Sequence, residues 1–130
     1  MKKITTLFLS LLFVMSAMIS NAAEYSVYFD NSAKWSKVNI YGWNGGLNFG
    51  AWPGKNITNY EKTPEGYIKV TVTADSDPGA AGGKIIFNNG SAQTADLKWT
   101  TNMIYTKNGS TGQLYGGGEV EIFEYKVYFD

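Results

Sequence analysis

The chain has 130 residues, the size of a single domain, and its 11 basic and 11 acidic residues give a formal net charge of zero. This balance gives no indication of nucleic acid or an anionic membrane surface as a partner. Histidine and cysteine are both absent, which excludes disulfides, the usual zinc sites and nucleophiles activated by histidine. Aromatic residues make up 15% of the chain, and this high share directs attention to the rings.

Residues 1–22 are predicted to form a secretory signal peptide. Lysines supply a positive start, an apolar run spans 7–19, and small residues allow cleavage after Ala22 or after Ala23. A membrane span needs about 20 apolar residues, so this shorter run predicts a cleaved signal rather than an anchor. We therefore expect a protein that is secreted, or located in the periplasm or at the cell surface, with no membrane attachment after cleavage.

Beyond the signal, apolar and polar residues alternate with the period of a strand in six short segments, and no segment repeats apolar residues at helical spacing. The segments are 25–29, 38–43, 67–73, 84–88, 103–106 and 119–129. Short strands separated by Gly, Asn, Asp and Pro predict an all-β sandwich or barrel.

The predicted domain, a β-sandwich module over 24–108, is followed by a glycine- and polar-rich linker over 109–124. The motif YSVYFD at 25–30 then returns as YKVYFD at 125–130. A repeat at about the length of a domain indicates tandem modules, so the final segment is predicted to be the first strand of a truncated second module. The alternative is that both copies are ordinary strands of one sheet, similar because Tyr, Val and Phe suit strands.

Two large rings share one face of the strand predicted at 38–43. Side chains alternate between faces, so Tyr41 and Trp43 point the same way, together with Asn39. Val38 and Ile40 have the opposite parity and are expected to face the core. An Asn in phase with two rings indicates an exposed face, because an amide seeks water or a ligand.

A third ring, Trp52, follows a glycine-rich turn and precedes Pro53, which restricts the backbone on both sides of the bond. Held beside Tyr41 and Trp43, it would complete a preformed platform that loses little rotamer freedom on binding. Such a platform suits sugar rings, whose C–H faces lie on the aromatic surface while their hydroxyls stay free. Nucleobases would also stack, but residues 38–54 contain no basic residue. Protein partners remain an alternative, since Tyr and Trp are favoured interface anchors.

Neutral polar side chains follow the strand predicted at 84–88. Asn89, Gln93 and Thr94 offer donors and acceptors suited to uncharged hydroxyls, and we expect them to supply hydrogen bonds to the ligand. For the asparagines of the NNG turn, turn geometry alone is an equal explanation.

Carboxylates do not indicate catalysis in this chain. They lie mostly in turns and on charged strand faces, without the apolar surroundings that a glycosidase acid needs. Asp75 and Asp77 could supply oxygen ligands to calcium, but two carboxylates in a loop are more simply explained as solvated. We therefore expect no enzyme activity, no metal site and no cofactor.

The chain resembles a family-26 carbohydrate-binding module in five ordered segments: YFDNSAKWSKVNIYGWNG, AWPG, GYIKVTV, KIIFNNGSAQTADL and MIYTKNG. This family is the starch-binding β-sandwich of secreted bacterial α-amylases, and the resemblance runs from about 25 to 109. It implies an immunoglobulin-like sandwich that binds α-1,4-linked glucans without hydrolysing them. The family's three stacking rings correspond to Tyr41, Trp43 and Trp52, and its polar contacts to Gln93 and Thr94.

Three functions are therefore considered. The first is starch or maltooligosaccharide binding that targets an associated glycoside hydrolase, such as an α-amylase, to its substrate. The second is an extracellular adhesion or scaffold domain whose rings bind a protein partner. The third, a small hydrolase, would require release of reducing sugar by the pure chain.

Overall fold

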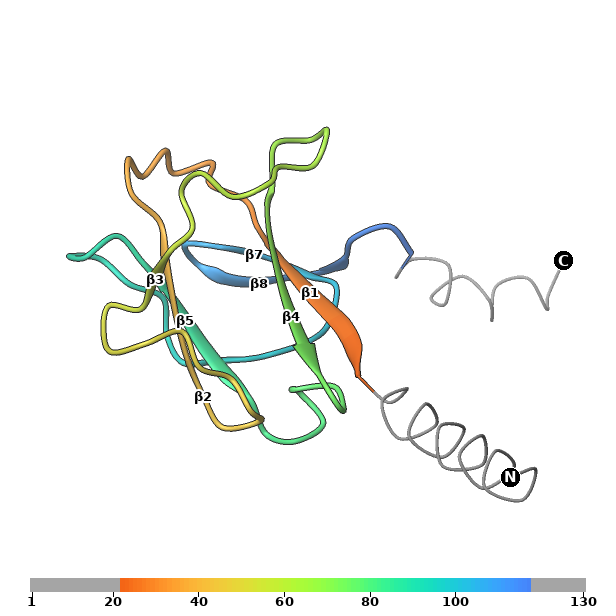
Figure 1. The fold of residues 1–130 in the computed structure, drawn as a ribbon. Helices are drawn as coiled ribbons and strands as arrows, with labels where there is room; N and C mark the ends of the chain where they lie inside the picture. The colour runs from red at the N-terminus through yellow and green to blue at the C-terminus, as the bar shows by residue number, and fades with distance from the viewer. Residues whose placement is uncertain (1–21, 118–130) are drawn as a thin grey trace, which may run out of the picture.

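The computed structural model describes residues 22–117, which form two four-stranded sheets that face each other (Figure 1). The strands are β1 (Ala23–Phe29), β2 (Asn39–Trp43), β3 (Lys55–Asn56), β4 (Ile68–Ala74), β5 (Lys84–Asn88), β6 (Leu97–Lys98), β7 (Met103–Thr106) and β8 (Gly109–Leu114). The first sheet has the order β4-β1-β7-β8 and the second the order β3-β2-β5-β6. Among the strands of residues 22–117, only β1 and β7 pair in parallel. The described part contains no helix that is long and apolar enough to cross a membrane.

The core lies between the sheets and follows from the alternation of side chains along the strands. Val27 and Phe29 of β1 face Ile40 of β2 and Phe87 of β5, and all four are fully buried. The rings of Phe29 and Phe87 stack across the interface with their centroids 4.5 Å apart. The predicted all-β sandwich is thus confirmed, whereas its immunoglobulin-like connectivity remains a prediction.

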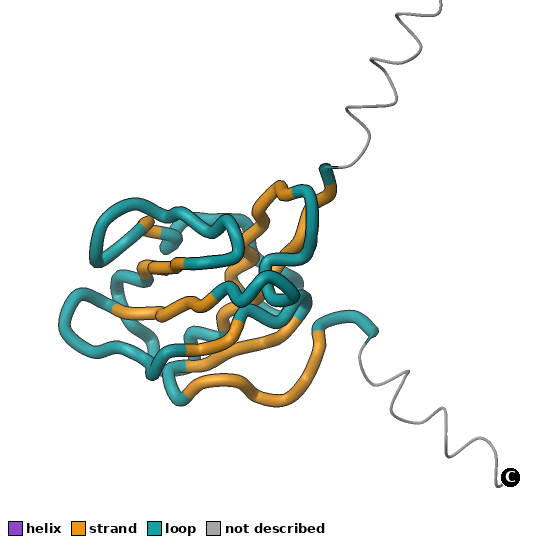
Figure 2. The backbone as a smooth tube through the Cα atoms, turned by 90° about the horizontal axis from the view of Figure 1, so that it is seen from below, coloured by secondary structure: helices purple, strands orange, loops and turns teal. Residues whose placement is uncertain are grey.

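Loops make up much of the remaining chain and gather at the ends of the two sheets, as the teal segments of Figure 2 show. In the loop before β2, the ring of Trp35 packs on Phe29 with centroids 5.6 Å apart. The side chain of Asn31 accepts a hydrogen bond from the backbone N–H of Trp35 at 3.0 Å and donates one to its carbonyl at 2.9 Å. These contacts give Trp35 a structural role in the packing of the sandwich.

The chain after 108 packs on the domain, and the prediction of a linker beginning at 109 is wrong over this part. Residues Gly109–Leu114 form β8, an antiparallel partner of β7. Gly109 adopts a positive φ of 113°, which lets the chain reverse so that β8 can hydrogen-bond to the edge of β7. The module therefore extends at least to the end of β8 at Leu114.

The outer face of the first sheet is covered by the end of the described chain. The ring of Tyr115 stacks on Tyr28 with centroids 4.4 Å apart and meets Tyr67 edge-on at 6.1 Å. Its hydroxyl donates a hydrogen bond to Glu65 at 3.0 Å, and this bond raises the pKa of Tyr115. The pKa of Glu65 is lowered by a backbone hydrogen bond and by the bond from Tyr115.

Residues 1–21 and 118–130 lie outside the described range. These ranges hold nearly all of the predicted signal peptide, the strand predicted at 119–129, and the second copy of the repeat at 125–130. The remainder of the predicted linker, 118–124, lies outside it as well.

Candidate functional site

The outer face of the second sheet carries two of the predicted rings. In the register of β2 and β5, Tyr41 lies opposite Ile86, and Trp43 lies opposite Lys84. Cross-strand partners share a face, so these four side chains form adjacent rows. The ring centroids of Tyr41 and Trp43 are 5.8 Å apart, with an interplanar angle of 36°, and both rings are half-buried.

The connection over 44–54 returns across this face and adds the third ring. Trp52 meets Tyr41 edge-on, with centroids 5.3 Å apart and ring planes at 71°. It is the only large hydrophobic residue among 22–117 that is exposed, with 47% of its surface accessible. We call Tyr41, Trp43 and Trp52 together the ring cluster. The structure places all three side by side, as the platform hypothesis requires, while their binding roles remain predictions.

Glycines between the rings allow backbone and side chains to approach closely. Gly42 lies on the inner face of β2, where an added Cβ would sit 3.0 Å from the ring of Phe49. The missing side chain therefore makes room for that ring, which packs against the core. Gly54 has a φ of 95°, and a Cβ there would overlap the carbonyl oxygen of Ile40. The loop bearing Trp52 can therefore lie directly on β2 only because residue 54 is glycine.

The expectation that Asn39 is exposed is wrong. It shares the outer face with Tyr41, but only 3% of its surface is accessible. Its side-chain amide donates a hydrogen bond to Oδ1 of Asn88, its cross-strand partner, at 3.0 Å. Asn88 in turn donates to the carbonyl of Pro53 at 3.0 Å, so the loop over this face replaces water as the partner of the amides.

The three polar residues predicted to contact ligand have different environments. Gln93 is exposed, next to the end of β5 through a bridge between its backbone and that of Asn88. Asn89 is half-buried, and its Oδ1 accepts hydrogen bonds from the backbone N–H groups of Ser91 and Ala92 at 2.8 and 2.7 Å. Turn geometry therefore explains this asparagine, whereas Gln93 is free to meet a ligand.

Thr94 does not fit a ligand-contacting role. It is 3% exposed, and its hydroxyl accepts from the N–H of Phe87 at 3.1 Å and donates to the carbonyl of Ala95 at 2.9 Å. The hydroxyl therefore accepts from one backbone group, in β5, and donates to another, at the residue that follows Thr94. The sequence could not reveal this, because a threonine after a turn has the same polarity whether it is buried or exposed.

A cationic side chain beside the rings was not singled out in the sequence. Lys84 is half-buried and lies opposite Trp43 on one side and opposite Lys98 of β6 on the other. As the cross-strand partner of Trp43 it shares the outer face with the ring cluster, and an ammonium group offers hydrogen-bond donors. The sequence could have indicated this position, because residues 84, 86 and 88 of a strand lie on the same face. Lys84 therefore shares a face with Ile86 and Asn88.

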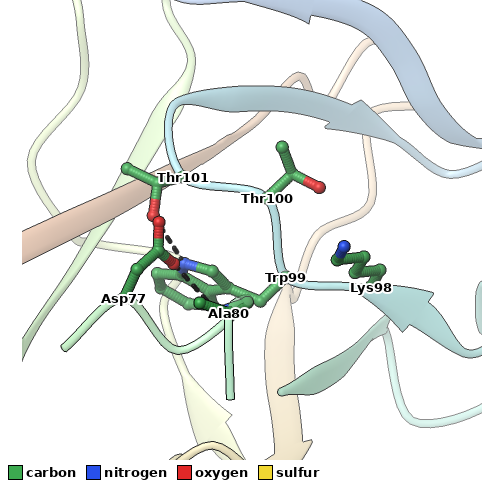
Figure 3. Close-up of a pocket in the computed structure, with 7 residues that line it drawn as sticks. Asp77, Ala80, Lys98, Trp99, Thr100 and Thr101 are labelled. Atoms are coloured by element: carbon green, nitrogen blue, oxygen red, sulfur yellow. Dashed lines mark hydrogen bonds between the residues drawn. The ribbon is translucent and has the colours of Figure 1, made fainter. Parts of the chain in front are cut away.

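A shallow pocket elsewhere on the domain contains none of the predicted ring residues. It is lined by Asp77, Gly79, Ala80, Lys98, Trp99, Thr100 and Thr101 (Figure 3). Two of these side chains already hydrogen-bond within the domain. Asp77 accepts from the N–H of Gly79 at 2.9 Å, and the Trp99 indole donates to Thr101 at 3.0 Å. In residues 22–117, no three acidic, histidine or cysteine side chains are grouped so that they could hold a metal ion.

Comparisons with known proteins place this geometry in a family. The fold is similar to that of CBM25-2 of the β/α-amylase from Paenibacillus polymyxa, at 24% identity and a TM-score of 0.48, covering 72% of this chain and 88% of that chain. It is also similar to iodinated CBM25 from the Bacillus halodurans amylase, at 22% identity and a TM-score of 0.41, covering 65% and 87%. The family model of starch-binding module 26 matches residues 27–99, more than half of the chain, and spans the whole ring cluster. The chain therefore belongs to the starch-binding module 26 family, CBM26.

Proposed function

We propose that this module binds starch and maltooligosaccharides on the ring cluster. The observation that carries the proposal is the contact of three partly accessible rings on one sheet face, within the range that the family model matches. Their planes are inclined at 36° and 71° to Tyr41 rather than parallel. An α-1,4-linked glucan bends between successive glucoses, so inclined rings can each meet a sugar face along the curve.

Hydrogen bonds would come from the edges of the cluster. Lys84 supplies donors beside Trp43, and Gln93 extends from the turn after β5. Both side chains can pair with glucose hydroxyls, which donate and accept. The rings provide contact area and the polar residues provide orientation, as in other sites for small neutral ligands.

The module is a non-catalytic domain, as carbohydrate-binding modules of this family are. Its proposed role is to hold a secreted glycoside hydrolase, such as an α-amylase, on its insoluble substrate. A single small platform binds weakly, because each ordered sugar loses conformational freedom. Linking the module to a hydrolase domain, or to a second module, would raise the local concentration of each for the same polysaccharide.

Affinity electrophoresis with soluble starch in the gel tests the binding proposal. The full chain should be retarded, and Tyr41→Ala or Trp52→Ala should weaken binding about tenfold or more, since exposed aromatic anchors carry much of the energy of such contacts. The half-buried Tyr67, which precedes β4 and contacts Tyr115 of the other sheet's outer face, provides the control, and Tyr67→Ala should leave the retardation unchanged. Absence of retardation of the unmodified chain would refute starch binding and return a protein partner to first consideration.

A further inference from the structure

Two asparagines are buried beneath the loop that carries Trp52. Asn39 is 3% exposed and Asn88 is fully buried, and they face each other across β2 and β5 on the side of the sheet away from the core. A buried amide is unfavourable unless its donors and acceptor are satisfied. Ile86, two residues before Asn88 on the same face, shows that an apolar side chain can be buried here. Filling space therefore does not explain why residues 39 and 88 are asparagines.

Asn88 connects three parts of the candidate site through both ends of its amide. Oδ1 accepts hydrogen bonds from Asn39 on β2 and from the N–H of Gly90, each at 3.0 Å. Nδ2 donates to the carbonyl of Pro53 at 3.0 Å. One side chain therefore joins the strand of Tyr41, the turn that leads to Gln93, and the residue that follows Trp52.

The Trp52 ring is 47% exposed and approaches Tyr41 edge-on. Its orientation therefore depends on how the backbone of its loop is held. The backbone around it is held by the close contact of Gly54 with Ile40, by the bond from the N–H of Gly54 to the carbonyl of Ala51 at 2.7 Å, and by Asn88. Of these anchors, only Asn88 connects the loop to β5.

We propose that Asn88, supported by Asn39, is a positioning residue that fixes the 71° angle between Trp52 and Tyr41 and thereby makes the ring cluster selective for curved glucans. This inference rests on the proposed function. With the hydrogen bond to Pro53 intact, the rings already have the inclination that a bent chain requires. Without it, the loop can move, and Trp52 must be ordered again each time a ligand binds.

The test compares Asn88→Ser with the unmodified full chain, both labelled with 5-fluorotryptophan. Serine retains an oxygen that can cap Gly90 but lacks the amide N–H that reaches Pro53. The ¹⁹F resonance of Trp52, assigned with Trp52→Phe, should shift and broaden, while that of buried Trp99 stays in place. Affinity for a rigid cyclodextrin should fall about tenfold, and more than affinity for a linear maltooligosaccharide that can adapt to a displaced ring.

A matched control separates positioning from general stability. Asn31→Ser removes an amide that bonds Trp35, whose ring packs on Phe29 of the core. It should lower the melting temperature yet leave the Trp52 resonance and the ratio of the two affinities unchanged. An unchanged Trp52 resonance and unchanged affinities in folded Asn88→Ser would overturn the proposal.

Two further measurements keep the inference testable whatever the variant does. If Asn88→Ser fails to fold, Asn39→Ser, which removes the support but keeps the bond to Pro53, should give a smaller change of the same kind. In the unmodified protein, the side-chain amide protons of Asn88 should exchange with solvent more slowly than those of Asn89, and equal rates would contradict the proposal. Because the ¹⁹F and exchange readouts need no ligand, they stand even if the module does not bind starch.

Discussion

At the scale of single residues, polarity did not determine exposure in this domain. Asn39, Asn88 and Thr94 are all buried, and each side chain hydrogen-bonds to a neighbouring strand or loop. Among the described residues, no buried side-chain nitrogen or oxygen lacks a partner. Polar residues near a binding face can therefore support the site from below, and exposure separates Gln93, which is available to a ligand, from Thr94, which is not.

Substitution of Gln93 and Thr94 should have opposite consequences. Thr94→Val removes a buried hydroxyl that accepts from Phe87, and leaving that N–H unpaired should lower the free energy of unfolding by about 1–3 kcal/mol. The folded fraction should bind starch as the unmodified chain does. Gln93→Ala should leave stability within about 0.5 kcal/mol while weakening binding. Denaturant titration and affinity electrophoresis measure the two effects, and weakened binding by folded Thr94→Val would restore its ligand role.

At the scale of elements, the site depends on how the loop over 44–54 lies on β2. The strand presents Tyr41 and Trp43 by alternation alone, but Trp52 reaches them only because the backbone at Gly54 approaches the carbonyl of Ile40. This contact and the bond from Asn88 hold the loop from two neighbouring strands. The ring cluster is therefore assembled from one regular element and one irregular element.

Gly54→Ala should displace the loop. The new Cβ would overlap the Ile40 carbonyl oxygen, and φ of 95° is unfavourable for alanine, so stability should fall by more than about 1 kcal/mol and starch binding should weaken in the folded fraction. Gly46→Ala is the matched control, because it has a similar φ of 79° with no atom within 4 Å of the added Cβ. Thermal unfolding and affinity electrophoresis report both effects. Equal binding by the two variants would show that the close approach at Gly54 does not position Trp52.

At the scale of the whole molecule, the two sheets have outer faces of different kinds. One carries the ring cluster, and the other is covered where Tyr115 stacks on Tyr28. This cover depends on β8, which brings the chain back across the edge of β7. The strand therefore belongs to the folded unit, although its composition is that of a linker.

Truncation of the chain measures the contribution of β8 to the stability of the domain. A chain ending at 117 is the reference, because it retains every contact described for the domain. A chain ending at 108 loses the partner of β7 and the ring over Tyr28, and its melting temperature should fall by at least about 10 °C. Near-ultraviolet circular dichroism follows the unfolding of both. Equal melting temperatures would show that β8 is dispensable, as a linker would be.

Much of the fold could be predicted from local sequence, because alternation and turn residues act over a few positions. Strands β2, β4, β5 and β7 lie within a residue of their predicted bounds, and β1 begins two residues earlier than predicted. The two-residue strands β3 and β6, and the glycine-rich β8, were not predicted. They have no periodic pattern of their own and become strands because a neighbouring edge supplies their hydrogen bonds.

For the candidate site, the amino-acid sequence by itself determined that Tyr41 and Trp43 share a face, because that follows from the period of a strand. It also carried the motifs by which the family is identified. Only the tertiary structure decided that Trp52 lies against Tyr41 at 71° and that Asn39 is covered, since both depend on a loop meeting strands distant in sequence. Contacts of that kind arise when distant segments pack together and buried amides pair with each other. A pattern over a few neighbouring residues does not specify such contacts.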